Sequence, residues 1–525
     1  MICVALMPET TAVALDTLAE AAKAADLVEL RLDAMREFDL ARLLANPPCP
    51  LIVTYRPRRE GGLYDGPEPA RLETLRQAAR LGARYVDVEH DSIAAIGDVP
   101  HEKVIVSYHN FEKTPADLAD IHARLAATGA AVVKVAVMAR HILDTAAVLR
   151  ILRNARKPTI ALAMGPRGVL TRILAPKFGA LLTYAGAGAG PEAAPGHISA
   201  TEMRQLYHVD RIGPKTRVYG VIADPVGHSL SPRIHNAAFA ETGLDAVYLP
   251  LWVEGDPAAF VQAMREFDFD GYSVTIPHKQ AVMAAADEIE PLARQIGAIN
   301  TIQRRQDGSL LATNTDWTAG LAAIEAVVGK GWLAGKRALI VGAGGVGRAM
   351  AFALKERGAD VTLTDVDESR AETLAKDVGV GTMPIASLQR GGSGEPPRSG
   401  LHKDGRGGPL ETGRGGLRED GRGGSPDLPR QEWDALLNCT PIGMHPKIDA
   451  TPLPREMLRP GMLVYDAVYN PLETRLIREA REAGCRTVAG IDHFVRQAVE
   501  QFELWTGRPA PAETMRRVVV EALTR

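Results

Sequence analysis

The stretch Ala131-Val132-Val133-Lys134-Val135-Ala136-Val137 places one lysine in the middle of an apolar run. Such a run is typical of a strand buried on both faces. An ammonium group buried there costs free energy unless it is paired or gives up its proton. Desolvation lowers the pKa of a lysine, and a neutral lysine attacks ketones to form a Schiff base. The alternative is a strand-end lysine whose charged head reaches solvent, and this segment alone does not separate the two.

More short apolar runs surround this segment within the first two hundred residues, with stretches of helical periodicity between most of them. Eight strands alternating with helices predict a (β/α)8 barrel, for which about 200 residues is near the lower size limit. The connection at 91–99 is too short for a full helix, so a doubly wound open sheet is the alternative. The expected strands are 2–7, 27–32, 51–55, 85–88, 103–107, 131–137, 159–164 and 181–184, with helices at 11–25, 70–81, 116–127 and 144–154.

The composition bounds the class of protein. At 525 residues the chain is too long for one core and predicts about three domains of ordinary size. It is 46% hydrophobic with a net charge of -3, which argues against nucleic acid or a membrane as the main partner. Its four cysteines are scattered, its N-terminus lacks a basic signal region, and no apolar run reaches the length of a membrane helix. We therefore expect a cytoplasmic protein without a metal site.

Charged side chains follow the carboxyl ends of the predicted barrel strands, which is where barrel enzymes carry their chemistry. Taken singly, each arginine is explained equally well as a solvated rim charge, and the histidine as an ordinary strand-end residue. One lysine, one histidine, two glutamates and three arginines at one mouth are harder to explain in that way. They are Glu29, Arg31, Arg56, Glu60, His109, Lys134 and Arg172.

These residue types suit the dehydration of a β-hydroxy keto acid. As an imine, Lys134 would act as an electron sink that acidifies the carbon next to a ketone. His109 could remove that proton and return it to a leaving hydroxyl, while Glu60 holds the imidazole in orientation. The arginines could pair bidentately with a substrate carboxylate.

The stretches Glu29-Leu30-Arg31, Arg56 with Glu60-Gly61-Gly62, Ser107-Tyr108-His109-Asn110-Phe111, Lys134-Val135-Ala136-Val137-Met138, Arg172 and Ala194-Pro195-Gly196 are similar to those of a known family. Over roughly residues 1–205 the chain resembles the type I 3-dehydroquinate dehydratases. The resemblance implies that Lys134 forms the Schiff base and that His109 is the acid/base. It also implies that substrate is held by Glu29, Arg31, Arg56 and Arg172.

One departure from this family follows the last barrel strand. The family usually has Ser-Ala-Pro-Gly-Gln there, whereas this chain has Ala193-Ala194-Pro195-Gly196-His197. Two positions that hydrogen-bond substrate therefore become Ala193 and His197. We expect this change to affect substrate affinity more than the Schiff-base chemistry.

A second set of motifs begins where the barrel pattern stops, around residues 208–216. A new strand opens at 217–222, and a loop at 224–232 leads into a helix. A later strand turns into a helix at Pro277-His278-Lys279, where a lysine is by itself more often an ordinary helix-start residue. Asn300 and Asp316 add an amide and a carboxylate at further strand ends, and a helix at 316–328 follows.

A glycine-rich turn marks the next domain. Gly342-Ala343-Gly344-Gly345-Val346-Gly347 lies between a predicted strand at 337–341 and a predicted helix at 348–356, and a second strand at 360–364 ends in Asp365. Glycines here let the backbone approach a pyrophosphate at a helix N-terminus, and the acid binds a ribose hydroxyl. In this context the turn is the dinucleotide fingerprint, and we expect a nicotinamide cofactor.

The motifs of this half are Gly227-His228-Ser229-Leu230-Ser231-Pro232, Val274-Thr275-Ile276-Pro277-His278-Lys279, 297–301, Asn314-Thr315-Asp316, the Gly342 turn, 438–444, Asp466-Ala467-Val468-Tyr469 and Gln497. With them the chain resembles shikimate dehydrogenase over about 217–525, apart from 390–430. The resemblance implies that Lys279 and Asp316 form the catalytic pair that handles the proton while hydride moves. It implies shikimate contacts from Ser229, Ser231, Thr275, Asn300, Tyr469 and Gln497. It implies cofactor contacts from the Gly342 turn, Ala467 and Gly490.

The coenzyme-selecting stretch departs from the commoner pattern of this family. NADP-using members usually carry Asn-Arg-Thr after the second strand, and the arginine pairs with the 2′-phosphate. This chain has Asp365-Val366-Asp367 instead. Two carboxylates should repel a phosphate and accept a ribose diol. We therefore expect NAD(P)H as cofactor with a preference for NAD, unless a more distant arginine such as Arg370 supplies the missing charge.

Residues 390–430 are rich in glycine, proline and arginine, and Gly-Arg-Gly-Gly recurs from Gly405, Gly413 and Gly421. The stretch has no apolar face to bury, so we expect a disordered, solvated loop insertion. Arg-Gly-Gly tracts can also bind RNA, which is an alternative from a different class. Against it, acidic residues alternate with the arginines and no aromatic is interleaved.

The two resemblances complement each other, because the product of the first reaction is the substrate of the second. We interpret the chain as a fused, bifunctional enzyme of the shikimate pathway: a lyase barrel followed by a two-domain α/β oxidoreductase. The expected domains are 1–208 (barrel), 209–216 (linker), 217–316 (shikimate-binding), 317–489 (Rossmann-type, dinucleotide-binding) and 490–525 (helices returning to the substrate domain).

Two alternatives stay open. The chain could be an NAD-dependent quinate or shikimate dehydrogenase with a fused dehydratase that works in catabolism, or one half could be a degenerate scaffold. The expected partners are the small molecules 3-dehydroquinate, 3-dehydroshikimate and shikimate, with neither nucleic acid nor membrane. The sequence leaves monomer and homodimer open.

Overall fold

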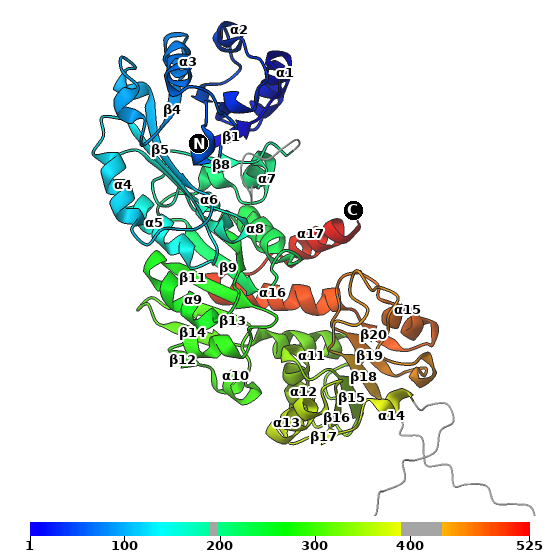
Figure 1. Ribbon diagram of the computed structural model, residues 1–525. Coiled ribbons are helices and arrows are strands. Elements are labelled where there is room, and N and C mark those ends of the chain that lie inside the picture. The colour runs from blue at the N-terminus through cyan, green and yellow to red at the C-terminus, as the bar shows by residue number, and fades with distance from the viewer. Residues whose placement is uncertain (189–197, 390–432, 525) are drawn as a thin grey trace, which may run out of the picture. The chain divides into compact units, whose positions relative to one another are not determined.

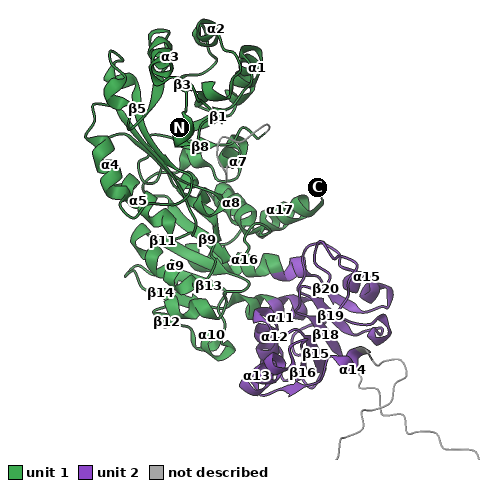
Figure 2. Cartoon of the chain, viewed as in Figure 1, with its two compact units in different colours: residues 1–319, 494–525 green, residues 320–493 purple. Residues whose placement is uncertain are grey.

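The computed structural model describes residues 1–188, 198–389 and 433–524. They form three sheets (Figure 1) and divide into two compact units, residues 1–319 with 494–525 and residues 320–493 (Figure 2). Unit 1 contains the first two sheets, and unit 2 contains the third. Within the described ranges no helix is long and apolar enough to cross a membrane.

The first sheet is a parallel eight-stranded barrel, which confirms the predicted fold. Neighbouring strands pair in chain order from β1 to β7, and β1 also pairs with β8. A doubly wound sheet would reverse its strand order, so that alternative is wrong. The barrel closes between β7 and β8 through a backbone hydrogen bond from Leu181 N to Thr159 O at 2.9 Å, just before β8 begins. β8 itself is too short to form a ladder with β7. The strands are β1 (Ile2–Leu6), β2 (Leu27–Arg31), β3 (Leu51–Thr54), β4 (Tyr85–Glu89), β5 (Val104–Asn110), β6 (Val132–Met138), β7 (Thr159–Met164) and β8 (Thr183–Ala185).

Helices connect these strands and cover the barrel (Figure 1). The first begins where the Thr10 side chain accepts from Val13 N, and it buries Ala14 and Leu18 against the sheet. As expected, the connection after β4, which the structure describes in full, holds no α-helix; it contains two short 3₁₀ turns, at Ile93–Ala95 and His101–Lys103. The helices are α1 (Thr11–Ala21), α2 (Leu40–Leu44), α3 (Glu68–Arg80), α4 (Leu118–Ala126), α5 (Asp144–Asn154), α6 (Val169–Ile173) and α7 (Ala200–Gln205).

The second sheet is mixed, with the order β10-β9-β11-β13-β14-β12. Its strands β9, β10 and β11 are parallel, so their carboxyl ends meet at one edge. The strands are β9 (Arg217–Ala223), β10 (Ala246–Trp252), β11 (Phe269–Val274), β12 (Glu288–Ile289), β13 (Thr301–Arg304) and β14 (Leu310–Thr313). The associated helices are α8 (Ser231–Thr242), α9 (Pro257–Met264), α10 (Pro291–Ile296), α11 (Thr315–Val328), α16 (Gly490–Thr506) and α17 (Ala512–Thr524).

The end of α16 is anchored on this second sheet, although it lies about two hundred residues later in the chain. Trp505 Nε1 donates to Ile302 O at 3.1 Å, and Gln501 Nε2 donates to Thr301 Oγ1 at 2.9 Å. The Trp505 indole stacks on Tyr219 of β9, with ring centroids 5.0 Å apart. This part of the fold therefore needs the last segment of the chain.

The third sheet is wholly parallel, with the order β17-β16-β15-β18-β19-β20. Its first crossover, from β15 through α12 to β16, contains the glycine turn. The strands are β15 (Arg337–Val341), β16 (Asp360–Thr364), β17 (Gly381–Thr382), β18 (Ala435–Asn438), β19 (Leu463–Asp466) and β20 (Arg486–Val488). The helices are α12 (Gly345–Glu356), α13 (Glu368–Val378), α14 (Ala386–Gln389) and α15 (Arg475–Glu482). The predicted insert, 390–430, lies outside the described residues.

Within unit 1 the barrel packs directly against the second sheet. Arg153 pairs with Glu266 at 2.8 Å, and its guanidinium lies 5.1 Å from the ring centre of Phe267. Phe178 meets the same Phe267 ring edge-on at 5.7 Å. Apolar and charged contacts together therefore hold the two sheets as one compact body.

Candidate active sites

Lys134 lies inside the barrel, on β6, and its side chain does not reach solvent. The residue is 4% exposed, and its Nζ lies 2.9 Å from Glu29 Oε2 and 2.9 Å from Asp87 Oδ2. The face of the Tyr184 ring lies 4.5 Å from the same nitrogen. The alternative of a solvent-reaching lysine is therefore wrong, and the buried charge is compensated by two carboxylates.

Both carboxylates are ionised next to this ammonium. Burial raises the pKa of Asp87, but the Arg56 guanidinium and then the Lys134 ammonium outweigh burial and hold this pKa far below its usual range. Burial also opposes the ionisation of Glu29, but Lys134 keeps the pKa of Glu29 below its ordinary value. The lysine is thus held between two carboxylates.

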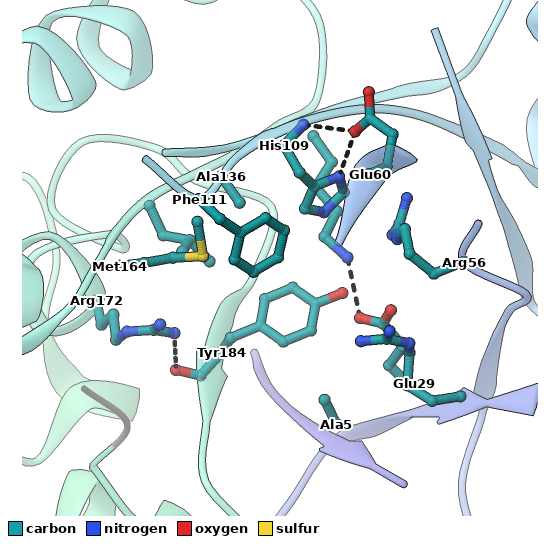
Figure 3. A pocket seen from close by; sticks show the side chains of 13 residues that line it. Ala5, Glu29, Arg56, Glu60, His109, Phe111, Ala136, Met164, Arg172 and Tyr184 are labelled. Atoms are coloured by element: carbon teal, nitrogen blue, oxygen red, sulfur yellow. Dashed lines mark hydrogen bonds and ion pairs between the residues drawn. The ribbon is translucent and has the colours of Figure 1, made fainter. Parts of the chain in front are cut away.

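His109 and Glu60 meet at the mouth of the same pocket (Figure 3), as the sequence predicts. Glu60 Oε2 lies 3.2 Å from His109 Nδ1 and accepts a hydrogen bond from His109 N at 2.8 Å. Burial, and then the charge of Arg56, lowers the pKa of His109 well below 6.5. Burial raises the pKa of Glu60 to about 7, against the opposing charge of Arg56. The imidazole is therefore neutral at neutral pH and can accept a proton.

The predicted arginines line the pocket, and the structure gives each a protein partner. Arg31 forms a bidentate pair with Asp33, at 2.9 and 2.7 Å. Arg56 is buried and pairs with Asp87 at 2.9 Å and Glu89 at 2.8 Å. Arg172 Nη1 donates to Tyr184 O at 3.2 Å. The predicted residues that line this one pocket are Glu29, Arg31, Arg56, Glu60, His109, Lys134 and Arg172. Ala193 and His197 lie outside the described residues.

Sequence reasoning missed Asp87, Glu89, Ser107 and Tyr184 in this site. The signal was present for the first two, because Val86-Asp87-Val88-Glu89 puts carboxylates in a strand whose residues are all buried. Ser107 donates to Asp87 Oδ1 at 2.5 Å and accepts from Arg56 Nη1 at 2.9 Å. Tyr184 carried no signal beyond its place at the end of a predicted strand.

A second site lies at the carboxyl edge of the second sheet. Lys279, which follows β11, forms a 2.5 Å ion pair with Asp316 in the first turn of α11, and both side chains are buried. Asn314 Oδ1 accepts from Asp316 N at 2.9 Å and so fixes the start of that helix. The two residues that the sequence predicts as a catalytic pair are therefore in direct contact.

The predicted shikimate-binding residues of unit 1 lie in loops, at helix starts and on α16. Ser229 and Ser231 lie on the loop and the first turn of α8 that follow β9, and Thr275 directly follows β11. Asn300 Oδ1 accepts from Thr315 N at 2.8 Å, which ties the strand end to α11. Gln497 lies on α16, and its amide donates to Phe494 O at 2.9 Å. Tyr469 follows β19 in unit 2.

The glycine turn of unit 2 leads from β15 into α12. Gly342 has a φ of +106°, and Gly344 is the N-cap residue of the helix. A Cβ on Gly344 would meet nothing within 4 Å, whereas one on Gly347 would lie 1.8 Å from Gly342 O. The turn thus leaves open space in front of a helix N-terminus, a geometry that fits a pyrophosphate.

The acidic residue after β16 lies against this turn. Asp365 Oδ2 accepts from Ala343 N at 2.6 Å, and Asp365 Oδ1 pairs with Arg370 Nη2 at 2.7 Å. Burial raises the pKa of Asp365, but hydrogen bonds outweigh burial and lower this pKa. The largest of these contributions comes from the backbone N–H of Ala343. Ala467 N donates to Asn438 O at 2.9 Å, and a Cβ on Gly490 would lie 2.2 Å from Val468 O. These residues fit a dinucleotide.

The fold and the two sites define a class of protein: a barrel lyase fused to a dinucleotide-dependent dehydrogenase. The family model for type I 3-dehydroquinase matches residues 2–214, that for the shikimate dehydrogenase substrate-binding domain matches 221–302, and that for the shikimate 5'-dehydrogenase C-terminal domain matches 490–520. The chain is 40% identical over 513 residues to the chloroplastic bifunctional 3-dehydroquinate dehydratase/shikimate dehydrogenase of Arabidopsis thaliana, covering 93% of this chain and 79% of that protein.

Other similarities cover the second half. The NADP(+) shikimate dehydrogenase of Moorella thermoacetica is 38% identical over 60% of this chain and 96% of its own length. The crystal structure of shikimate 5-dehydrogenase from Thermus thermophilus with NADP(H) and shikimate covers 58% of this chain and 100% of that one, with 30% identity and a TM-score of 0.46. The chain belongs to the family of bifunctional type I 3-dehydroquinase/shikimate dehydrogenases. It therefore has 3-dehydroquinate dehydratase and shikimate dehydrogenase activities of the shikimate pathway, as the sequence predicts.

Proposed function

We propose that the barrel dehydrates 3-dehydroquinate through an imine on Lys134. The observation that carries the proposal is the Lys134 ammonium, held at 2.9 Å from both Glu29 and Asp87 in the pocket that also contains His109. The nitrogen must lose a proton before it attacks the substrate ketone, and Glu29, which lines the pocket, is the carboxylate placed to receive it. Arg172, which lines the same pocket, is the proposed partner of the substrate carboxylate.

His109 carries the second proton transfer in this proposal. Its imidazole is neutral because burial and then Arg56 lower its pKa, so it can accept the proton from the carbon next to the imine. It then returns that proton to the hydroxyl that leaves as water. Glu60, 3.2 Å from His109 Nδ1, orients the ring during both transfers.

For the second site we propose that Lys279 and Asp316 handle the proton when 3-dehydroshikimate is reduced to shikimate. Lys279 donates a proton to the carbonyl oxygen, and Asp316 at 2.5 Å orients the lysine and relays a proton from solvent back to it. Ser229, Ser231, Thr275, Asn300, Tyr469 and Gln497 are the proposed shikimate ligands. A nicotinamide cofactor, when bound, supplies the hydride.

We propose that the cofactor is NAD in preference to NADP. Gly342, Gly344 and Gly347 shape the turn that receives the pyrophosphate, and Asp365 stands where a ribose diol would bind. The supporting observation is that Arg370, the arginine that could supply a charge for a 2′-phosphate, is already paired with Asp365. Recruiting Arg370 to a 2′-phosphate would break that pair and leave the carboxylate facing the phosphate. Steady-state kinetics should give a higher kcat/KM with NAD than with NADP, and a clearly higher value with NADP would contradict the proposal.

A coupled assay tests the two activities in one experiment. Wild-type protein supplied with 3-dehydroquinate and reduced cofactor should oxidise the cofactor. Lys134→Ala should oxidise it only when 3-dehydroshikimate is supplied, and Lys279→Ala should accumulate 3-dehydroshikimate without cofactor oxidation. Cofactor oxidation by Lys134→Ala with 3-dehydroquinate alone would exclude the imine mechanism. Quinate should be oxidised poorly compared with shikimate if the enzyme works in biosynthesis.

We also propose that the protein works in a reducing compartment such as the cytoplasm. Cys3, Cys49 and Cys485 are free thiols, and Cys3 is buried in the barrel. Thiols of this kind persist where disulfides do not form. Fractionation of the source cells with antibody detection should find the protein in the cytosol.

A further inference from the structure

The Tyr184 hydroxyl is a buried polar group that the mechanism above does not use. Tyr184 lies on β8 and is 4% exposed. Its hydroxyl makes no hydrogen bond of good geometry within the described residues, and its nearest polar neighbours are the Glu29 carboxylate and the Cys3 thiol, with which it interacts electrostatically. Buried hydroxyls usually have a partner, and an orphaned one inside a pocket points to a ligand.

The side chain is aimed into the pocket and held there. Figure 3 shows the ring in the centre of the pocket with its hydroxyl directed at the Glu29 carboxylate. The ring face lies 4.5 Å from Lys134 Nζ, and Arg172 fixes the strand behind it by donating to Tyr184 O at 3.2 Å. Burial, and then Glu29, raises the pKa of Tyr184 well above 10. The hydroxyl therefore stays a neutral phenol and a hydrogen-bond donor.

We propose that Tyr184 is a further catalytic residue of the dehydratase, whose hydroxyl donates a hydrogen bond to the ketone oxygen that Lys134 displaces. The inference rests on the proposed imine role of Lys134. A ketone carbon that bonds to Nζ must lie beside the Tyr184 ring, and its oxygen then comes within reach of the hydroxyl. Two of the pocket arginines pair with carboxylates, Arg172 is the proposed partner of the substrate carboxylate, and His109 is proposed to act at the neighbouring carbon, so the Tyr184 hydroxyl is a donor available to this oxygen.

The step is balanced without an external reagent. The ammonium of Lys134 passes one proton to a neighbouring carboxylate, the nitrogen bonds to the ketone carbon, and the carbonyl electron pair moves to oxygen. Tyr184 donates a hydrogen bond to that oxygen while its negative charge develops. The oxygen then takes up the proton held by the carboxylate and a second proton from the nitrogen. The carbon–oxygen bond breaks, and water leaves. Of the three ammonium protons one remains on the protonated imine, and Tyr184 ends the step unchanged.

Substitution of Tyr184 with phenylalanine distinguishes the contribution of the hydroxyl from that of the ring. Tyr184→Phe in the full-length chain keeps the ring face next to Lys134 and removes only the donor. We expect imine formation, measured by rapid mixing with 3-dehydroquinate, borohydride quench and mass spectrometry of the Lys134 peptide, to slow about 10²-fold. The KM for 3-dehydroquinate should change little, because the interaction develops during the reaction. Tyr85→Phe, on β4 outside the pocket lining, is the matched control and should react at the wild-type rate.

The second activity of the same chain reports on folding. Tyr184→Phe should keep the wild-type shikimate dehydrogenase kcat and melting temperature. Unchanged trapping of Tyr184→Phe would overturn the inference, whereas absence of a trapped Lys134 adduct in wild type would instead overturn the imine proposal. If the phenylalanine variant is unstable, 3-fluorotyrosine at position 184 keeps the shape and strengthens the donor. It should trap faster than wild type, and trapping at an equal or lower rate would contradict the proposal.

Discussion

At the scale of single residues, the charges around Lys134 are compensated rather than removed. Desolvation disfavours a buried charge on a lysine, but Asp87 lies as close to Nζ as Glu29 does, and the two carboxylates offset that cost. Burial instead shifts the pKa values of the next residues outward: it lowers the pKa of His109 and raises the pKa of Glu60. The predicted contact between these two is present, yet a sequence cannot give a pKa, because desolvation depends on atoms from many strands.

The pH dependence of the dehydratase should follow Glu60. Its pKa is raised to about 7, so protonation removes the anion that orients His109 as the pH falls through about 7. We expect kcat/KM for 3-dehydroquinate to decline on the acid side with an apparent pKa near 7, since this profile reports the free enzyme. Titration of His109 alone would place that limb well below 6.5, because the pKa of His109 is lowered.

Glu60→Gln tests which group sets this limb. The variant should be slower at neutral pH and should lose the limb near 7. An acid limb that stays near 7 in Glu60→Gln would show that another group controls it.

At the scale of elements, the apolar runs predict the long buried strands closely, but they do not predict the short strands at the edges of the second and third sheets. All eight barrel strands were expected, because parallel strands buried on both faces read as continuous apolar stretches. β12 and β17 have two residues each, too few for any periodicity, and they are defined only by their neighbours β14 and β16. The glycine turn was predictable because its spacing depends on local sterics.

Two glycines of this turn should respond differently to alanine. Gly347→Ala would put a Cβ 1.8 Å from Gly342 O, so the backbone must shift, and we expect a loss of about 1–3 kcal/mol in the stability of unit 2. Gly344→Ala meets nothing within 4 Å and should keep the wild-type melting temperature. It should still raise the KM for the cofactor, because the methyl group occupies the space proposed for the pyrophosphate.

Thermal unfolding of the two variants by circular dichroism, together with cofactor kinetics, checks this pair. Equal melting temperatures for Gly347→Ala and wild type would contradict the close approach of Gly347 to the Gly342 carbonyl. An unchanged cofactor KM in Gly344→Ala would contradict the proposed position of the pyrophosphate.

At the scale of the whole molecule, unit 1 joins the barrel to the sheet that carries Lys279. Arg167, which follows β7, pairs with Glu254 and lies 4.9 Å from the ring centre of Trp252. Trp252 Nε1 donates to Asp224 Oδ1 at 2.9 Å, at the start of the loop that carries Ser229. No sequence pattern indicated this connection, because it joins side chains from three distant segments. The domain boundaries predicted from sequence and the preference for NAD stay predictions.

Arg167→Ala should therefore weaken shikimate binding from a position in the barrel. We expect the KM for shikimate to rise about 2–5-fold with kcat unchanged, the size that a partly exposed ion pair of up to about 1 kcal/mol allows. Arg36→Ala, which removes an exposed ion pair with Glu9 within the barrel, is the control and should leave this KM unchanged. An unchanged KM in Arg167→Ala would show that the barrel does not position the shikimate loop.

The return of α16 to the second sheet also sets an order of events during synthesis. The barrel strands are all present once residue 185 has left the ribosome, whereas the sheet of β9 to β14 must wait for Gln501 and Trp505. The roughly 190 residues between the end of β14 at Thr313 and Trp505 take about 10–40 s to translate at about 5–20 residues per second. During that interval the nascent chain exposes an apolar sheet face beside a finished barrel. A nonsense mutation near the 3′ end of the gene should therefore leave an active dehydratase barrel joined to an incompletely folded second sheet, which chaperones would bind.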